Sequence, residues 1–139
     1  MEEKSADDMP GAGFGQLTAG YEFPPVSYKL SGTAISGYLT AVDGQEGGVL
    51  SGFVPPMFIA ARSLAVLSGL VSSLAGSIHA SQEFEFLRLV PIGTAIECYG
   101  KVVQNLRRGK LHLLVIGLSV FNQDKEQVLA GKATLLLAD

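Results

Sequence analysis

The sequence contains little cysteine, little charge and no excess of basic side chains. Cys98 is its only cysteine, so an intramolecular disulfide and a four-cysteine zinc site are both excluded, and we expect no metal ion. The net charge of −3 provides no basic surface for nucleic acid. The sequence does not start with an apolar run of the kind that directs secretion, so we expect a cytoplasmic protein.

Apolar residues make up 47% of the 139 residues and charged residues only 17%. That length suits one domain with a core of its own. The apolar share is high for a small soluble domain, which predicts a buried interface with another subunit.

The longest stretch of low polarity is residues 54–75, in which Arg62 is the only charge. About 20 apolar residues are needed to span a membrane. Arg62, four serines and the proline pair that opens the stretch argue against a span, so we expect no membrane partner. Apolar residues recur at helical spacing on more than one face, which predicts a long helix buried nearly all round and ended by Gly76.

Several shorter elements precede this helix. Residues 1–15 are acidic and rich in glycine, which predicts a flexible tail before a domain spanning 16–139. Residues 26–30 are predicted to form a short strand, and residues 33–42 a helix capped by Ser31. Residues 43–52 hold four glycines and are predicted to form a loop.

After Gly76 the apolar pattern changes to a period of two, which is typical of strands. Phe84 and Phe86 are expected on one face, and Glu83 and Glu85 on the other. Four strands are predicted, at residues 77–90, 94–104, 110–121 and 127–138, with turns at 91–93, 105–109 and 122–126. Short turns favour an antiparallel meander of three or four strands. The strand at 110–121 is apolar on both faces, so it should be central or covered by a partner. Together these elements predict an α+β domain in which one sheet wraps one long helix.

Four short motifs stand in this framework: AGYEFP at 19–24, the segment 35–43, GFVPPMF at 52–58, and His79, QEF at 82–84, Arg88 and PIG at 91–93. Their order resembles the hotdog fold and, within it, the MaoC-like (R)-specific enoyl-CoA hydratases and 3-hydroxyacyl dehydratases. Within this family, the last two motifs are most similar to the fatty-acid-synthase-like N-terminal dehydratase branch. The resemblance implies a single hotdog domain that needs no cofactor and acts on acyl thioesters of coenzyme A or a carrier protein.

The catalytic loop of the family resembles G-D-x-N-P-x-H-x-D, in which an aspartate and a histidine move the proton and the water. Here the corresponding stretch, 42–48, reads VDGQEGG. Asp43 stands at the aspartate position, no histidine is present, and Glu46 is the nearest titratable substitute. The resemblance makes Asp43 and Glu46 the candidate acid/base residues. The alternative is that both are solvated loop carboxylates.

The family polarises the thioester carbonyl with a backbone N–H at the helix N-terminus, usually that of a glycine after proline. Here Pro56 replaces that glycine and has no N–H. Met57, or groups near Gly52, would have to donate instead. Gly52, Val54, Pro56 and Met57 are therefore candidate substrate-binding residues.

Two further candidates lie after the helix. His79 is expected to be either a structural hydrogen-bonding residue or an acid/base group, and Arg88 either a surface charge or a contact for a coenzyme A phosphate. His112 is expected in the core or at an interface. Arg107, Arg108 and Lys110 form a basic turn that is either solvated or in contact with a phosphate.

Three functions fit the resemblance. The chain is an acyl-thioester hydratase or dehydratase with a degenerate loop, a non-catalytic hotdog subunit that pairs with a catalytic chain and shapes its acyl tunnel, or an acyl-CoA thioesterase. In each case we expect a homodimer, or a heterodimer with another hotdog subunit, because hotdog domains typically join their sheets about a two-fold axis.

Overall fold

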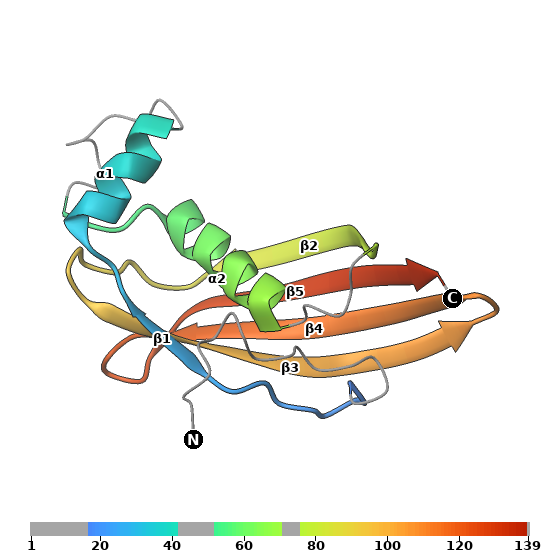
Figure 1. The fold of residues 1–139 in the computed structure, drawn as a ribbon. Coiled ribbons are helices and arrows are strands. Elements are labelled where there is room, and N and C mark those ends of the chain that lie inside the picture. The colour runs from blue at the N-terminus through green and yellow to red at the C-terminus, as the bar shows by residue number, and fades with distance from the viewer. Residues whose placement is uncertain (1–16, 42–51, 71–75, 139) are drawn as a thin grey trace, which may run out of the picture.

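An antiparallel sheet of five strands packs against one long helix in the computed structural model, which describes residues 17–41, 52–70 and 76–138 (Figure 1). The elements are β1 (Val26–Lys29), α1 (Gly32–Ala41), α2 (Pro56–Leu70), β2 (Ile78–Phe86), β3 (Ala95–Arg108), β4 (Leu111–Phe121) and β5 (Gln127–Ala138). The predicted tail at 1–15, Asp43 and Glu46 lie outside the described residues. In the part of the chain that the structure describes, no helix has the length and apolar character to cross a membrane.

The strands stand in the order β1-β3-β4-β5-β2 (Figure 1). β3, β4 and β5 are joined by short turns and form the predicted antiparallel meander. β2 pairs with β5 instead of with β3, its successor in the chain, and β1 pairs with β3 at the other edge. β4 is the central strand, as its two apolar faces predicted.

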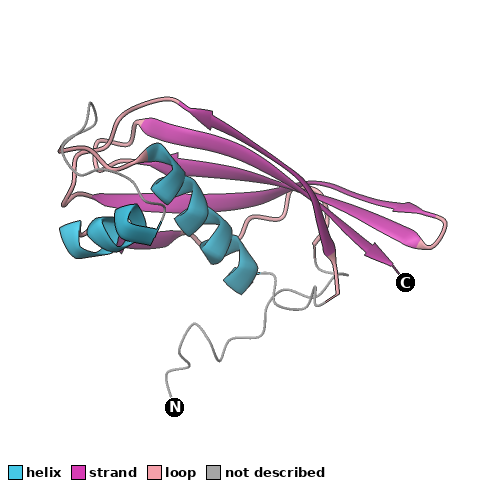
Figure 2. Ribbon diagram, turned by 90° about the horizontal axis from the view of Figure 1, so that it is seen from above, coloured by secondary structure: helices cyan, strands magenta, loops and turns pink. Residues whose placement is uncertain are grey.

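α2 lies across one face of the sheet (Figure 2). Its buried residues include Ile59, Ala60, Ser63 and Leu67. Beneath it, alternate residues of the central strand are buried: Leu114, Ile116, Leu118 and Val120. Two clusters of buried side chains fill this layer, one at each half of the helix.

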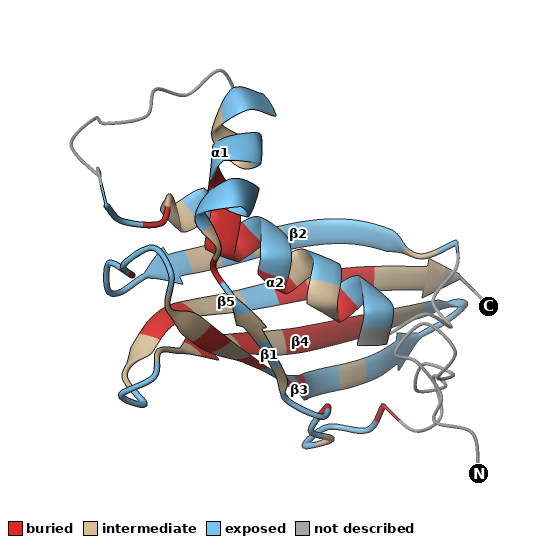
Figure 3. Ribbon diagram, turned by 60° about the vertical axis from the view of Figure 1, so that its left-hand side comes forward, coloured by how far each residue is buried: buried red, intermediate tan, exposed pale blue. Residues whose placement is uncertain are grey.

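The prediction that the long helix is buried nearly all round is wrong. Met57, Ala61, Ala65 and Ser68 on its outer side are exposed, and Figure 3 shows this exposed stripe along α2. The reason is that a single sheet covers only one side of the helix. Three of these four side chains are small, so exposing them to water costs little.

α1 and its cap agree with the prediction. The N–H of Ala34 donates to Ser31 Oγ at 3.3 Å, and the N–H of Ile35 donates to the Ser31 carbonyl at 3.2 Å. The side chain of Ile35 is buried in the core. Ser31 therefore caps the helix whose inner face closes one end of the core.

β2 alternates as predicted. Phe84 and Phe86 lie opposite Gly131 and Leu129 of β5, on the face that α2 covers. Glu83 lies opposite Lys132 on the other face and forms an ion pair with it at 3.6 Å.

The turn between β3 and β4 is shorter than predicted. Residues 105–108 continue β3, and the chain turns at Gly109 and Lys110, with Gly109 at φ +61. Leu106 pairs with Leu113, and Asn105 Nδ2 donates to the Leu17 carbonyl at 2.8 Å, so both are held in the strand. The result is a long hairpin with a two-residue turn. Figure 2 shows strands of the sheet extending beyond the helices.

Candidate functional site

The start of α2 is held by a short antiparallel contact with the segment that follows β2. The N–H of Val54 donates to the Val90 carbonyl at 2.7 Å, and the N–H of Ile92 donates to the Gly52 carbonyl at 3.1 Å. Gly52 has φ +85, a conformation that favours glycine, and the Val54 side chain is buried. These contacts fix the direction in which the chain enters α2.

The first turn of α2 presents the backbone N–H of Met57. Pro56 has no N–H, and the N–H of Phe58 donates to the Pro55 carbonyl at 2.9 Å. For the N–H of Met57 no acceptor is recorded outside the helix among the described residues. It stands at the positive end of the dipole of a 15-residue helix, where it can receive a negatively charged oxygen.

Several apolar side chains on the first turn of α2 and on the segments next to it are exposed. The Met57 side chain is 54% exposed. Its neighbours on the paired segments, and on the segment that leads from β2, are also exposed: Phe53, Leu87, Leu89 and Ile92. This combination of an N–H donor and apolar side chains suits a ligand with a polar carbonyl and an apolar chain.

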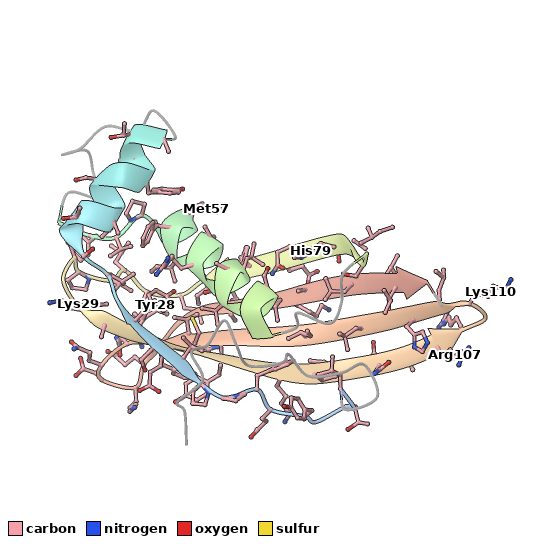
Figure 4. All side chains as sticks on the ribbon, in the orientation of Figure 1. Tyr28, Lys29, Met57, His79, Arg107 and Lys110 are labelled. Carbon is pink, nitrogen blue, oxygen red and sulfur yellow. The ribbon has the colours of Figure 1, made fainter. Side chains whose placement is uncertain are left out.

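The structure brings four of the predicted site residues together and separates a fifth. Gly52, Val54, Pro56 and Met57 all lie at the start of α2. His79 lies near the beginning of β2, about 23 Å along the strand from Phe86 at a rise of about 3.3 Å per residue. In Figure 4, Met57 and His79 are well apart, on different elements.

His79 and Arg88 both have partners within the chain. His79 is exposed, and its Nε2 lies 2.9 Å from Gln82 Oε1. Arg88 Nη1 forms an ion pair with Glu126 Oε2 at 3.2 Å, and both side chains are exposed. Arg88 is therefore an exposed charge in this structure, and its second predicted role, a contact for a coenzyme A phosphate, stays a prediction. The segment that contains Asp43 and Glu46 lies between α1 and α2 in the sequence and directly precedes Gly52.

A polar cluster under α2 was not predicted. Ser63 Oγ donates to the Ile59 carbonyl at 2.8 Å and lies 3.6 Å from Cys98 Sγ, which is 3.7 Å from the Tyr28 hydroxyl. The Arg62 guanidinium lies 5.3 Å from the centre of the Tyr28 ring. Cys98 is buried in a strand, as predicted. One sequence signal was available, because Ser63 interrupts an apolar stripe four residues after Ile59.

Burial controls the ionisation of this cluster. Desolvation raises the pKa of the Cys98 thiol above its usual value, although its hydrogen bonds with Ser63 and Tyr28 oppose the shift. Desolvation also raises the pKa of the Tyr28 hydroxyl, and the neighbouring Cys98 adds to that shift. Both groups are therefore neutral near pH 7, so the cluster joins β1, α2 and β3 without supplying an acid or base.

A shallow hollow of about 240 Å³ lies elsewhere, over β2 and β5. Its lining residues are Glu83, Phe84, Glu85, Ala130, Gly131 and Lys132. None of the candidate residues lines it, and it is widely open to solvent, so we do not assign the site to it.

Neither a family model nor a curated protein matches the sequence. Solved structures do match. The monoamine oxidase regulatory protein from Archaeoglobus fulgius has a TM-score of 0.79 at 18% identity, covering 93% of this chain and 95% of that one. The MaoC-like dehydratase from Rhodospirillum rubrum has a TM-score of 0.76 at 18% identity, covering 92% and 97%. The chain has the hotdog fold.

Two further solved structures share the fold. The R-hydratase PhaJ1 from Pseudomonas aeruginosa has a TM-score of 0.76 at 16% identity, covering 91% of this chain and 85% of that one. The HadBC complex from Mycobacterium tuberculosis, a 3R-hydroxyacyl-ACP dehydratase, has a TM-score of 0.70 at 16% identity, covering 86% and 97%. At these identities the likeness establishes the hotdog fold, and the chemistry must be argued from the site.

Proposed function

We propose that this chain is an acyl-thioester hydratase or dehydratase of the MaoC-like type, with its hotdog domain at residues 16–139. The observation that carries the proposal is the start of α2, which combines the Met57 N–H with exposed apolar side chains on the first turn and on the adjacent segments. A thioester carbonyl and its acyl chain fit such a surface. The R-hydratase and dehydratases among the structural neighbours support the same chemistry.

In this proposal the Met57 N–H binds the thioester oxygen and stabilises the negative charge that develops on it. For dehydration, one carboxylate of Asp43 or Glu46 takes the proton from the α carbon. The other, in its protonated form, gives a proton to the β hydroxyl, which leaves as water and forms the enoyl thioester. Hydration runs through the same groups in reverse.

The alternative is a non-catalytic hotdog subunit that shapes the acyl tunnel of a catalytic partner. The positions of the two histidines favour it, since His79 lies on β2 away from the start of α2 and His112 lies within β4. The HadBC complex, a dehydratase whose solved structure is described as a complex, is consistent with such a division of labour. For a thioesterase, the site supplies no observation of its own.

The free edge of β2 is the interface in this proposal. Among the described residues β2 has a partner strand on one side only, and two apolar side chains on it, Ile78 and Phe86, are 64% and 44% exposed. Pairing with β2 of a second copy, or of a related subunit, would satisfy the open strand edge and cover these side chains.

The test is the hydration of crotonyl-CoA by the purified chain, followed as loss of the enoyl absorbance. Asp43→Asn and Glu46→Gln are compared with Asp124→Asn, a matched change on the exposed β4–β5 turn. We expect hydration by the wild type and by Asp124→Asn, and a loss of about 10²-fold or more in at least one loop variant. Absence of hydration with short and long enoyl thioesters would reject the enzyme and favour the non-catalytic subunit.

A further inference from the structure

β2 forms an edge of the sheet, and half of its backbone groups point away from β5 (Figure 1). The N–H of Leu87 donates to the Val128 carbonyl of β5 at 3.0 Å, and successive residues of a strand direct their backbone groups to alternate sides. The Glu83 carbonyl oxygen also faces β5, since it lies 3.2 Å from the position of a Cβ added to Gly131. Three residues therefore direct their N–H and C=O groups to the open edge: Gln82, Phe84 and Phe86.

One antiparallel register pairs all three of these residues with the same three residues of a second copy. It places Phe84 opposite Phe84 of the partner subunit, and Gln82 opposite the partner's Phe86. A shift by two residues would bring in either Ala80, which the pairing of β2 with β5 skips, or Arg88, which lies beyond the end of β2. The register is two-fold symmetric, which is the commonest arrangement of two identical copies.

This register carries His79 across to the candidate site of the other copy. Three residues of β2 share the face that α2 covers, because each lies opposite a core residue of β5: His79, Gln82 and Phe86. The partner's Gln82 stands directly opposite Phe86, and the partner's His79 is level with residues 88 and 89. That segment runs on to Val90, whose carbonyl accepts the N–H of Val54 at the start of α2. His79 is remote from the start of α2 in its own copy, but the dimer brings it towards the start of the other α2.

The side chain of His79 is exposed, and a hydrogen bond orients it. The Gln82 amide nitrogen Nε2 donates to the Glu83 carbonyl at 3.0 Å, so the amide oxygen Oε1 faces His79 Nε2 at 2.9 Å. Because an amide oxygen only accepts hydrogen bonds, His79 Nε2 carries the hydrogen. In the neutral imidazole, Nδ1 is then an acceptor for a hydroxyl group or a water molecule.

We propose that His79 of the partner subunit accepts a hydrogen bond from the β hydroxyl of the substrate at the α2 site, and from the water that adds in the reverse reaction. This inference rests on the proposed function and its β2 dimer. The proton transfers stay with Asp43 and Glu46, and His79 holds the oxygen that leaves or attacks. Each site is then built from α2 of one copy and β2 of the other.

The other face of the same junction carries like charges. Glu83 lies opposite the partner's Glu85, which opposes pairing. Lys132 forms an ion pair with Glu83 at 3.6 Å and offsets part of this repulsion. Salt screens the remainder, so the dimer should be assayed at moderate ionic strength.

Cross-linking tests the placement without catalysis. Gln82→Cys with Phe86→Cys puts thiols on directly opposite residues of the two copies, with Cα atoms about 5.5 Å apart, which suits a disulfide. Within one copy the two positions are about 13 Å apart along the strand, too far to join. Ser81→Cys with Phe86→Cys is the control, because residues 81 and 86 lie on opposite faces of the sheet. Mild oxidation should give a covalent dimer of the first variant only, and its absence would overturn the inference.

Mixing two impaired variants of the full chain tests the role of His79. One is His79→Ala and the other is Asp43→Asn with Glu46→Gln, and each alone should retain at most about a tenth of the wild-type rate of crotonyl-CoA hydration. After exchange of subunits, a mixed dimer has one site with intact carboxylates and an intact His79 from the partner subunit. Half of the dimers are mixed and each has one complete site of two, so the mixture should recover about a quarter of the wild-type rate.

Mixing without recovery, or full activity of His79→Ala alone, would overturn the inference and leave the proposed function intact. A wild type that hydrates no enoyl thioester would reject the proposed function itself, whether or not the cross-link forms, and would leave the partner's His79 with no substrate hydroxyl to bind.

Discussion

Cys98, Ser63 and Tyr28 show how single residues tie three elements together. The thiol, the two hydroxyls and the Ile59 carbonyl satisfy one another in a core that is otherwise apolar. Because none of these groups is charged near pH 7, the cluster avoids the cost of burying an ion. At alkaline pH the cluster loses stability, because the thiol and the phenol lose their protons at a lower pH in the unfolded chain than in the folded protein.

Stability should therefore decrease on the alkaline side. The pKa values of Cys98 and Tyr28 are raised in the folded protein, so deprotonation favours the unfolded chain. Their contribution is complete below the unfolded values of about 8.5 and 10 and is lost as the pH rises above them. Urea unfolding at pH 7, 9 and 10 should show a progressive fall in the free energy of unfolding. A fall of the same size in Cys98→Ala with Tyr28→Phe would show that other groups cause it.

Gly131 and Gly37 form a matched pair for a test of packing. A Cβ added to Gly131 would lie 3.1 Å from the Phe84 ring and 3.2 Å from the Glu83 carbonyl oxygen, whereas one added to Gly37 in α1 meets nothing within 4 Å. We expect Gly131→Ala to destabilise the fold by about 1–3 kcal/mol. Gly37→Ala should stabilise it by about 0.5–1 kcal/mol, because alanine favours helices. Thermal unfolding of the two variants checks both signs, and a neutral Gly131→Ala would contradict the close approach of β2 to β5.

At the scale of the element, α2 carries the site through its first turn. Pro55 and Pro56 stand at the start of the helix. Pro56 lacks the N–H that a glycine supplies in the MaoC-like family, which the sequence resembles. The remaining donor, on Met57, is one residue later and so lies about 100° further around the helix axis. We therefore expect the thioester oxygen to be stabilised less well here than it would be by an N–H at position 56.

Pro56→Gly tests this directly, because it restores an N–H at the position that resembles the family's glycine. We expect kcat for crotonyl-CoA hydration to rise by about tenfold or more, with a loss of stability of about 1 kcal/mol from the more flexible glycine. Steady-state kinetics and thermal unfolding measure the two effects. Pro55→Gly, which adds an N–H just before the helix, is the control, and an equal gain in both variants would exclude a specific role for the first turn.

Most elements could be predicted from the sequence because each has one clear period. The alternation of Phe84 and Phe86 with Glu83 and Glu85 correctly assigned the faces of β2, and Ser31 correctly marked the start of α1. Residues 105–108 were placed in a turn because NLRRG is polar, whereas pairing of Leu106 with Leu113 keeps them in β3. Outward exposure of α2 was missed because composition cannot show that only one layer covers a helix.

For the whole molecule, the open edge of β2 is the decisive feature. Sequence reasoning could not pair β2 with β5, because the two are separated by the entire β3–β4 hairpin and only three-dimensional packing brings them together. The sequence also does not show how far His79 lies from the start of α2, because that separation depends on the place of β2 in the sheet. The role of His79 stays a prediction. The open edge of β2 is the surface at which the dimer predicted from composition can be tested.

Ile78→Lys with Phe86→Lys should convert the proposed dimer to a monomer. Both side chains are exposed in the single chain, so the fold should persist, while two lysines per copy would oppose pairing of the β2 edges. Light scattering at micromolar concentration measures the mass, and circular dichroism confirms folding. Val103→Lys, at an exposed apolar position on β3, should remain dimeric. A monomeric wild type, or a dimeric double variant, would exclude this interface.

The strand order also determines when the protein can fold. Both edge strands, β1 and β2, pair with strands that follow them in the chain, and the partner of β2 is the last strand, β5. During synthesis α2 and β2 therefore leave the ribosome long before the surface that covers them exists. Their apolar side chains stay exposed to solvent until β5 joins the sheet. A chaperone would be most useful during that interval.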